Sequence, residues 1–292
     1  MDFIVLGQQI INGLVNGMGY VLIATGLTLV FGVLRIVNFA HGEFYMLGAF
    51  LTYYALTLFG VDYVAAALLA TIAVAGLGIG ANRFFFRPLR KEHEFTILLS
   101  SLGLSLLIAN GAEELFGADP KYVMSPYADE ASEIGPFVVT EQRLIVFAAA
   151  AVVMAGVYWF IRYTRMGKMM QATAQNPEGA ALTGINTDFV HGYTFALACG
   201  LAALAGALVA PTAMLFPTVG SWAVLKGFIV VVMGGLGSVT GALLGGLLLG
   251  VVESLGGGYI SLGFKDAIGY AIIIAVLLWR PQGLFSVSRS TR

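Results

Sequence analysis

Four polar side chains stand close together between two long apolar runs, in the stretch RIVNFAHGEFYML at residues 35–47. Arg35, Asn38, His41 and Glu43 fall within nine positions of one another. An imidazole and a carboxylate could act as a general base or as metal ligands. Two such groups are too few for a closed metal site, and no nucleophile stands beside them. The stretch is therefore a polar turn or part of a pathway.

Other chemistries find no support in the sequence. The remaining histidines, His93 and His191, form no H-E-x-x-H pattern, and Cys199 is the single cysteine. The stretch GLGS at 235–238 is not a complete nucleophile elbow. GGLGSVTG lacks the G-K-[ST] ending of a phosphate-binding loop. We expect no enzyme, no metal site and no cofactor in this chain.

The elements that must position these residues are membrane spans. Hydrophobic residues make up 59% of the 292 residues and charged residues 11%, with a mean hydropathy of +0.88. A hydrocarbon core about 30 Å thick takes about 20 helical residues, and apolar runs of this length recur. We predict an all-α, polytopic integral membrane bundle, a single domain over 1–292, with a retained first span.

A net charge of -1 argues against a nucleic-acid partner, because the chain has no excess of basic residues to neutralise phosphates. About eight spans are expected, at 8–33, 44–60, 64–84, 95–112, 142–161, 190–212, 222–251 and 264–280.

Lysine and arginine set the orientation, because basic loops tend to stay in the cytoplasm. Basic clusters follow the third span (83–91) and the fifth (162–168), whereas the acidic loop at 113–141 belongs outside. Arg280, Arg289 and Arg292 also favour a cytoplasmic C-terminus. The run at 222–251 must then enter and return as two short pieces.

Glycines offer the break in that run, at Gly234, Gly235 and Gly237. Irregular backbone at membrane depth is tolerated where it lines a cavity or is buried in protein, so these three are pathway candidates. Small-xxx-small spacings, by contrast, predict close helix packing. They occur at Gly13 and Gly17, Gly76 and Gly80, and Gly246 and Gly250.

Four ionisable residues near span ends are also suspects for transport, because charge is costly in hydrocarbon. They are Glu43, Lys226, Glu253 and Asp266. Each is close enough to a predicted span end to reach the interface, and we expect no buried series like a proton relay. A channel or stand-alone carrier is therefore the less favoured class.

The cytoplasmic loop at 161–193 is long enough to be functional. Helix-forming residues run from Gly167 to Gln175, and Asn176-Pro177 then marks a boundary with proline suited to a first turn. A second short helix follows over 178–182 and ends before Gly184. We predict two surface helices here.

The same loop resembles a known signature. In EGAALTG, Glu178, Ala180 and Gly184 match the E-A-A-x-x-x-G pattern of bacterial ABC importer permeases, with Gly179 in place of alanine. Together with VNFAHGEFYMLGAF, VVVMGGLGSVTGALLGGLLLGVVES and RPQGLF, the chain resembles LivH-type permeases of the branched-chain amino acid importers from end to end.

That resemblance implies a permease subunit in the bacterial cytoplasmic (inner) membrane, importing leucine, isoleucine and valine. Its implied partners are a second, LivM-like permease, two cytoplasmic ATPase subunits that bind the ATP, and an extracytoplasmic solute-binding protein. Related permeases for urea, short amides or other amino acids stay open as alternatives. Residues 162–188 would form the loop that couples to the ATPase. Its candidate residues are Gly167, Ala172, Asn176, Glu178, Ala180, Gly184 and Asn186.

Two interpretations of the opening stretch remain. Asn38, His41, Gly42 and Glu43 are either a plain polar turn near the cytoplasmic interface or a gate. In the second case the polar side chains line the inner pathway or brace it by hydrogen bonds, and Gly42 permits close approach.

Overall fold

The computed structural model describes residues 3–128, 130–280 and 283–285. Pro281 and Gln282 of the RPQGLF motif, Arg289 and Arg292 lie outside the described residues. In chain order the elements are α1 (Phe3–Leu34), α2 (His41–Phe59), α3 (Tyr63–Ala81), the π-helix η1 (Asn82–Phe86), α4 (Arg87–Leu89), α5 (Glu94–Phe116), β1 (Ala131–Ile134), β2 (Phe137–Thr140), α6 (Glu141–Tyr163), α7 (Arg165–Gln175), α8 (Pro177–Leu182), α9 (Thr187–Val209), the 3-10 turn η2 (Ala210–Thr212), α10 (Val219–Gly234), α11 (Val239–Tyr259), the 3-10 turn η3 (Leu262–Phe264) and α12 (Lys265–Trp279).

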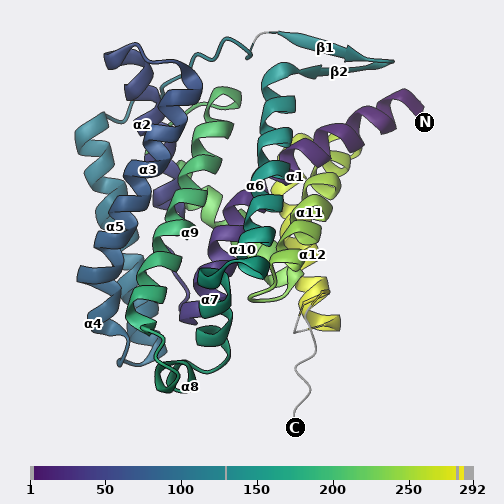
Figure 1. Ribbon diagram of the computed structural model, residues 1–292. Helices are drawn as coiled ribbons and strands as arrows, with labels where there is room; N and C mark the ends of the chain where they lie inside the picture. The colour runs from purple at the N-terminus through teal and green to yellow at the C-terminus, as the bar shows by residue number, and fades with distance from the viewer. Residues whose placement is uncertain (1–2, 129, 281–282, 286–292) are drawn as a thin grey trace.

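The fold is the predicted helical membrane bundle, with α7 and α8 at one end and the antiparallel hairpin β1–β2 at the other (Figure 1). Helices α1 and α9 form its centre, since 83% and 78% of their apolar windows are buried. The corresponding values for α3, α5 and α6 are 28%, 22% and 22%. Apolar helices with so much exposed surface are suited to contact lipid.

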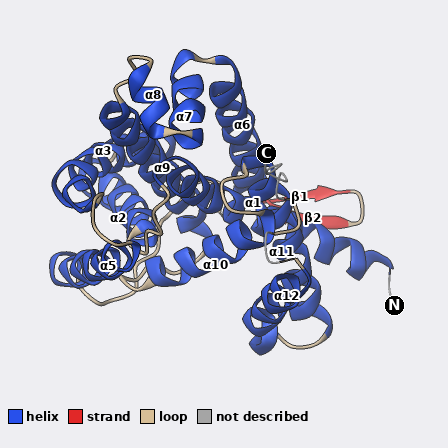
Figure 2. Cartoon of the chain, turned by 90° about the horizontal axis from the view of Figure 1, so that it is seen from below, coloured by secondary structure: helices blue, strands red, loops and turns tan. Residues whose placement is uncertain are grey.

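Six described helices are long and apolar enough to cross a membrane, so the expected count of eight is not confirmed. The predicted break in the run at 222–251 is confirmed, because the run forms two helices, α10 and α11, but α11 has 21 residues and is not a short piece. Helix α10 has 16 residues and α12 only 15, shorter than a full span. Viewed along the bundle, α11 and α12 lie on the opposite side from α3 and α5 (Figure 2).

The break between α10 and α11 lies at the predicted glycines. Helix α10 ends at Gly234, and Gly235 and Gly237 adopt φ values of +97° and +84°. Such left-handed backbone is open to glycine and unfavourable for other residues. A Cβ added to Gly32 would lie 3.3 Å from the Gly237 Cα, which places the turn close to the end of α1.

Helices α1 and α11 pack together antiparallel through glycines, as the small-xxx-small spacing predicts. A Cβ on Gly17 would lie 2.8 Å from the Gly246 carbonyl oxygen, and one on Gly13 2.8 Å from that of Gly250. No helix of the described chain packs closely against Gly76 and Gly80 on α3. Nothing in the described chain lies within 4 Å of a Cβ built at either, because these glycines face outward.

Candidate functional site

The opening polar stretch leaves the end of α1 and turns back into the bundle. Arg35 follows α1 with φ +56°, an uncommon value for a residue other than glycine. Its Nη2 atom donates a hydrogen bond of 2.9 Å to the Ala174 carbonyl oxygen on α7. The turn after α1 is thereby attached to α7, the first helix of the loop at 161–193.

Helix α2 then begins inside the bundle. The His41 side chain is fully buried, and a Cβ on Gly26 would lie 2.8 Å from its Nε2 atom. Gly26 precedes the end of α1 at Leu34 by eight residues, about 12 Å along a helix. Residues 35–40 are therefore non-helical backbone that enters the bundle, where protein rather than lipid surrounds it.

Glu43 joins α2 to two further helices. Its carboxylate is fully buried, and its Oε1 atom accepts a hydrogen bond of 2.9 Å from the Ser105 hydroxyl on α5. A Cβ on Gly220, the second residue of α10, would lie 2.5 Å from the Glu43 Oε2 atom. Gly42 approaches the Gly220 carbonyl so closely that no side chain fits between them.

Asn38 braces the non-helical stretch itself. Its Oδ1 atom accepts a hydrogen bond of 3.1 Å from the Ala40 amide, and the Phe39 amide donates 3.2 Å to the Ser101 hydroxyl on α5. Four buried polar atoms of the stretch have no hydrogen-bond partner within the described part of the chain. They are Asn38 Nδ2, His41 Nδ1, His41 Nε2 and Glu43 Oε2.

Asn38, His41 and Glu43 are thus all buried in the interior. The stretch that carries them is not an exposed turn at the membrane interface. The Gly234–Gly237 turn lies elsewhere, beside Gly32 rather than beside Gly26. A cavity of about 590 Å³ nearby has Tyr45 of α2 in its lining but none of Asn38, His41 and Glu43.

The second candidate site is the surface formed by α7 and α8, where both helices form as predicted. The Asn176 side chain caps α8 by accepting a hydrogen bond of 2.9 Å from the Gly179 amide. Pro177 occupies the first turn of α8, and Gly184 follows with φ +87°. Asn186 caps α9 in the same way, accepting 3.1 Å from the Phe189 amide.

The predicted coupling residues divide into exposed and inward-facing ones. Glu178 and Gly184 are exposed, and Leu182 is 90% exposed. Ala180 is buried and Ala172 is half-buried, so neither offers a free surface. A Cβ on Gly167 would meet the carbonyls of Phe160 and Ile161, which shows that Gly167 permits the tight corner between α6 and α7.

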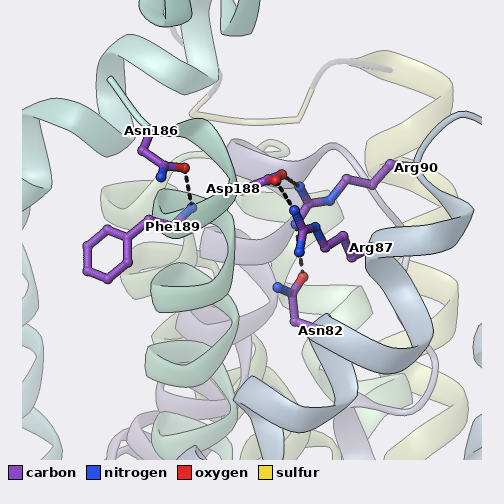
Figure 3. Close-up of polar contacts among 6 residues, drawn as sticks. All are labelled: Asn82, Arg87, Arg90, Asn186, Asp188 and Phe189. Atoms are coloured by element: carbon purple, nitrogen blue, oxygen red, sulfur yellow. Dashed lines mark hydrogen bonds and ion pairs between the residues drawn. The ribbon is translucent and has the colours of Figure 1, made fainter. Parts of the chain in front are cut away.

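An ion-pair cluster lies beside this surface, at the start of α9 (Figure 3). The Asp188 carboxylate at the start of α9 accepts hydrogen bonds of 2.5 Å from Arg87 and 2.6 Å from Arg90. Arg90 also donates 3.2 Å to the Asn82 side chain in η1. Burial lowers the pKa of Arg90, and the facing Asp188 carboxylate opposes that shift. The cluster fixes α9, directly after the loop, to η1 and the region of α4, which follow α3.

A second charged cluster lies inside the bundle and corrects an expectation. Lys226 on α10 and Glu253 on α11 do not reach an interface, because both side chains are buried and form an ion pair. Lys226 Nζ also donates 2.7 Å to Asp266 on α12, and the Tyr20 hydroxyl donates 2.9 Å to Glu253. Glu43 is buried as well. Lys226, Glu253 and Glu43 are therefore paired or hydrogen-bonded inside the protein, whereas Asp266 is 49% exposed.

The comparisons with known proteins agree with this architecture. Residues 9–277 match the family model described as branched-chain amino acid transport system / permease component. The chain belongs to this permease family. The permease is 35% identical to the high-affinity branched-chain amino acid transport system permease protein LivH of Escherichia coli, over 97% of this chain and 96% of the relative. It is 34% identical to BraD of Pseudomonas aeruginosa over 95% of this chain and 94% of the relative. It is 27% identical to the probable LivH of Methanocaldococcus jannaschii over 91% of this chain and 88% of the relative.

These relatives are permease subunits of transport systems, so this permease is a multi-pass membrane protein and not an enzyme. Sequence reasoning missed one structural feature beside the loop. The contact of Asp188 with Arg87 and Arg90 spans about a hundred residues. The sequence does place two arginines after one span and an aspartate at the start of another. The rule for membrane orientation counts such charges but does not predict which of them form ion pairs.

Proposed function

We propose that this permease is the transmembrane subunit of an ABC importer in the bacterial cytoplasmic membrane. It would move branched-chain amino acids (leucine, isoleucine and valine) inward, driven by ATP bound and hydrolysed in two partner ATPase subunits. A second, LivM-like permease would complete the pathway. A solute-binding protein would deliver the substrate from outside.

One observation carries the proposal: α8 stands exposed at the end of the bundle where the basic loops gather. Its Leu182 side chain is 90% exposed, yet both flanks of the helix are fixed by the caps of Asn176 and Asn186. An exposed helix that is held at both ends offers a protein partner a surface in a fixed position. Closure of the ATPases would push on this helix, and Arg35 would pass the motion from α7 to the end of α1.

The gate of this proposal is the non-helical stretch before α2. Buried polar atoms normally have hydrogen-bond partners, and unpaired ones call for an explanation. The unpaired atoms of Asn38, His41 and Glu43 would find partners in a second arrangement of the helices. A two-state element of this kind is what alternating access requires.

The relatives support the substrate, because the names of E. coli LivH and P. aeruginosa BraD specify branched-chain amino acids. Urea, short amides and other amino acids are the alternatives within the same permease class.

Reconstitution tests the proposal against a stand-alone carrier. The permease is placed in liposomes alone, with the second permease, and with the second permease plus the ATPases and binding protein. ATP-dependent leucine uptake only in the complete assembly supports the importer. Leucine uptake by the permease alone contradicts it.

A further inference from the structure

A cavity of about 590 Å³ opens in the half of the bundle away from α7 and α8. Its lining comes from α1, α2, α6, the end of α9, the segment between α9 and α10, the first turns of α10 and the start of α12. Arg143 in this lining is the third residue of α6, whose far end at Tyr163 adjoins α7 about 30 Å away along the helix. In the proposed orientation this is the outer half, where a solute-binding protein delivers.

The charges of the cavity have one sign. Its lining includes the cations Arg143 and Lys265 and contains neither aspartate nor glutamate. Arg143 donates a hydrogen bond of 3.3 Å to the neutral Asn12 side chain, and neither cation is ion-paired with a described residue. Two uncompensated cations at a partly enclosed site favour an anionic group.

Two aromatic side chains, Tyr20 and Trp222, form one wall of the cavity and are held by contacts with other residues. Tyr20 and Trp222 both line the cavity, with ring centroids 6.0 Å apart in an edge-to-face arrangement. Lys226 Nζ lies 5.7 Å from the Trp222 ring centroid, and the Tyr20 hydroxyl donates to Glu253. The nearby acids are therefore occupied by Lys226, and the wall is held in one position before any ligand arrives.

Apolar side chains complete the lining, among them Val15, Ile23 and Val146. A volume of this size falls within the usual range of small-molecule sites, which are mostly apolar with a few placed polar groups. The apolar part accommodates an aliphatic side chain, while the cations accommodate a carboxylate.

We propose that this cavity binds small aliphatic amino acids through their carboxylate, held by Arg143 and Lys265, with the ammonium group over the aromatic wall. The inference rests on the proposed function and narrows its substrate. Urea and short amides carry no carboxylate, so the two cations give them no charge-assisted hydrogen bond. The permease itself then selects among solutes, in addition to the binding protein.

Trp222 offers a direct reporter. The chain has three tryptophans, and Trp159 and Trp279 are 60% and 89% exposed. Replacing these two by phenylalanine leaves Trp222 alone in the full chain, held in nanodiscs of zwitterionic lipid. Its emission and saturation-transfer NMR are followed with leucine, with leucinamide, which lacks the carboxylate, and with 4-methylpentanoate, which lacks the ammonium group.

Saturable binding of leucine and 4-methylpentanoate, with little binding of leucinamide, is the expected result. Arg143→Gln should weaken leucine binding about tenfold, the size of one charge-assisted hydrogen bond. Arg143→Lys should restore part of it. Lys121→Gln is the control, because Lys121 is a cation outside the lining.

Equal binding of leucinamide and leucine overturns the inference, and so does the absence of a leucine signal in both methods. Both outcomes are measured without an Arg143 variant, so they do not depend on whether such a variant folds.

Leucine uptake by the complete complex separates this failure from failure of the proposed function. Uptake without a carboxylate preference at the cavity overturns the cavity assignment alone. Carboxylate-selective binding without leucine uptake overturns the proposed transport function while the cavity assignment stands.

Discussion

The hydroxyl of Tyr20 on α1 donates a hydrogen bond of 2.9 Å to the buried carboxylate of Glu253 on α11. The same carboxylate is paired with Lys226 on α10, which also binds Asp266 on α12. One charge cluster, buried except for the half-exposed Asp266, therefore connects four helices. Two of these, α10 and α12, are too short to span a membrane, so polar contacts inside the bundle help to hold them.

Removing one partner of this cluster should be costly. Lys226→Met leaves the Glu253 carboxylate buried without its cation, and we expect the free energy of unfolding to fall by roughly 3–5 kcal/mol. The double variant Lys226→Met with Glu253→Gln removes both buried charges and should recover most of that loss. Thermal unfolding in nanodiscs measures both. A single variant as stable as the wild type would show that the cluster does not hold the helices.

Glu43 should matter more for transport than for insertion. Glu43→Ala removes the acceptor of the Ser105 hydroxyl and the polar link between α2 and α5, so leucine uptake by the complete complex should fall severalfold. Ser105→Ala removes the same hydrogen bond but keeps the carboxylate. A smaller loss in Ser105→Ala assigns the role to the carboxylate itself, and His41→Ala should resemble Glu43→Ala. Normal uptake with membrane levels unchanged in both Glu43→Ala and His41→Ala would return the stretch to a structural turn.

The glycine seam between α1 and α11 gives a paired stability test. In Gly17→Ala the new Cβ would lie 2.8 Å from the Gly246 carbonyl oxygen, so the helices must separate and the melting temperature should drop. Gly76→Ala places its Cβ in open space on α3 and should be neutral, or stabilising by up to about 1 kcal/mol through helix propensity. Equal melting temperatures for the two variants would mean that the close approach contributes nothing.

Local signals predicted the elements well. The helices around the coupling surface could be predicted because Asn176, Pro177 and Gly184 set the start and the end of α8, and each affects only the backbone a few residues away. The break at Gly235 and Gly237 could be predicted for the same reason. That the break lies beside Gly32, near the end of α1, depends on packing between helices and carries no local signal.

Burial of charge could not be predicted from the sequence. Lys226 and Glu253 are 27 residues apart and each is near a span end, so an interfacial position was the simpler expectation. Their burial depends on three helices bringing opposite charges together. The same holds for Glu43, whose partner Ser105 lies on another helix, and for Arg143, which joins the cavity only when α6 packs beside α1.

The central claim is that the loop carrying α8 couples the permease to separate ATPases, and Gly184→Val tests it most directly. Gly184 and Gly60 both follow the end of a helix with a positive φ, +87° and +61°, and neither has an atom within 4 Å of an added Cβ, but Gly60 caps α2 outside the loop. The measurement is leucine transported per ATP hydrolysed by the reconstituted complex. We predict a loss of about tenfold or more for Gly184→Val, with Gly60→Val near wild type because it places a similar positive-φ strain away from the loop. An unchanged ratio in Gly184→Val, or an equal loss in both variants, would contradict it.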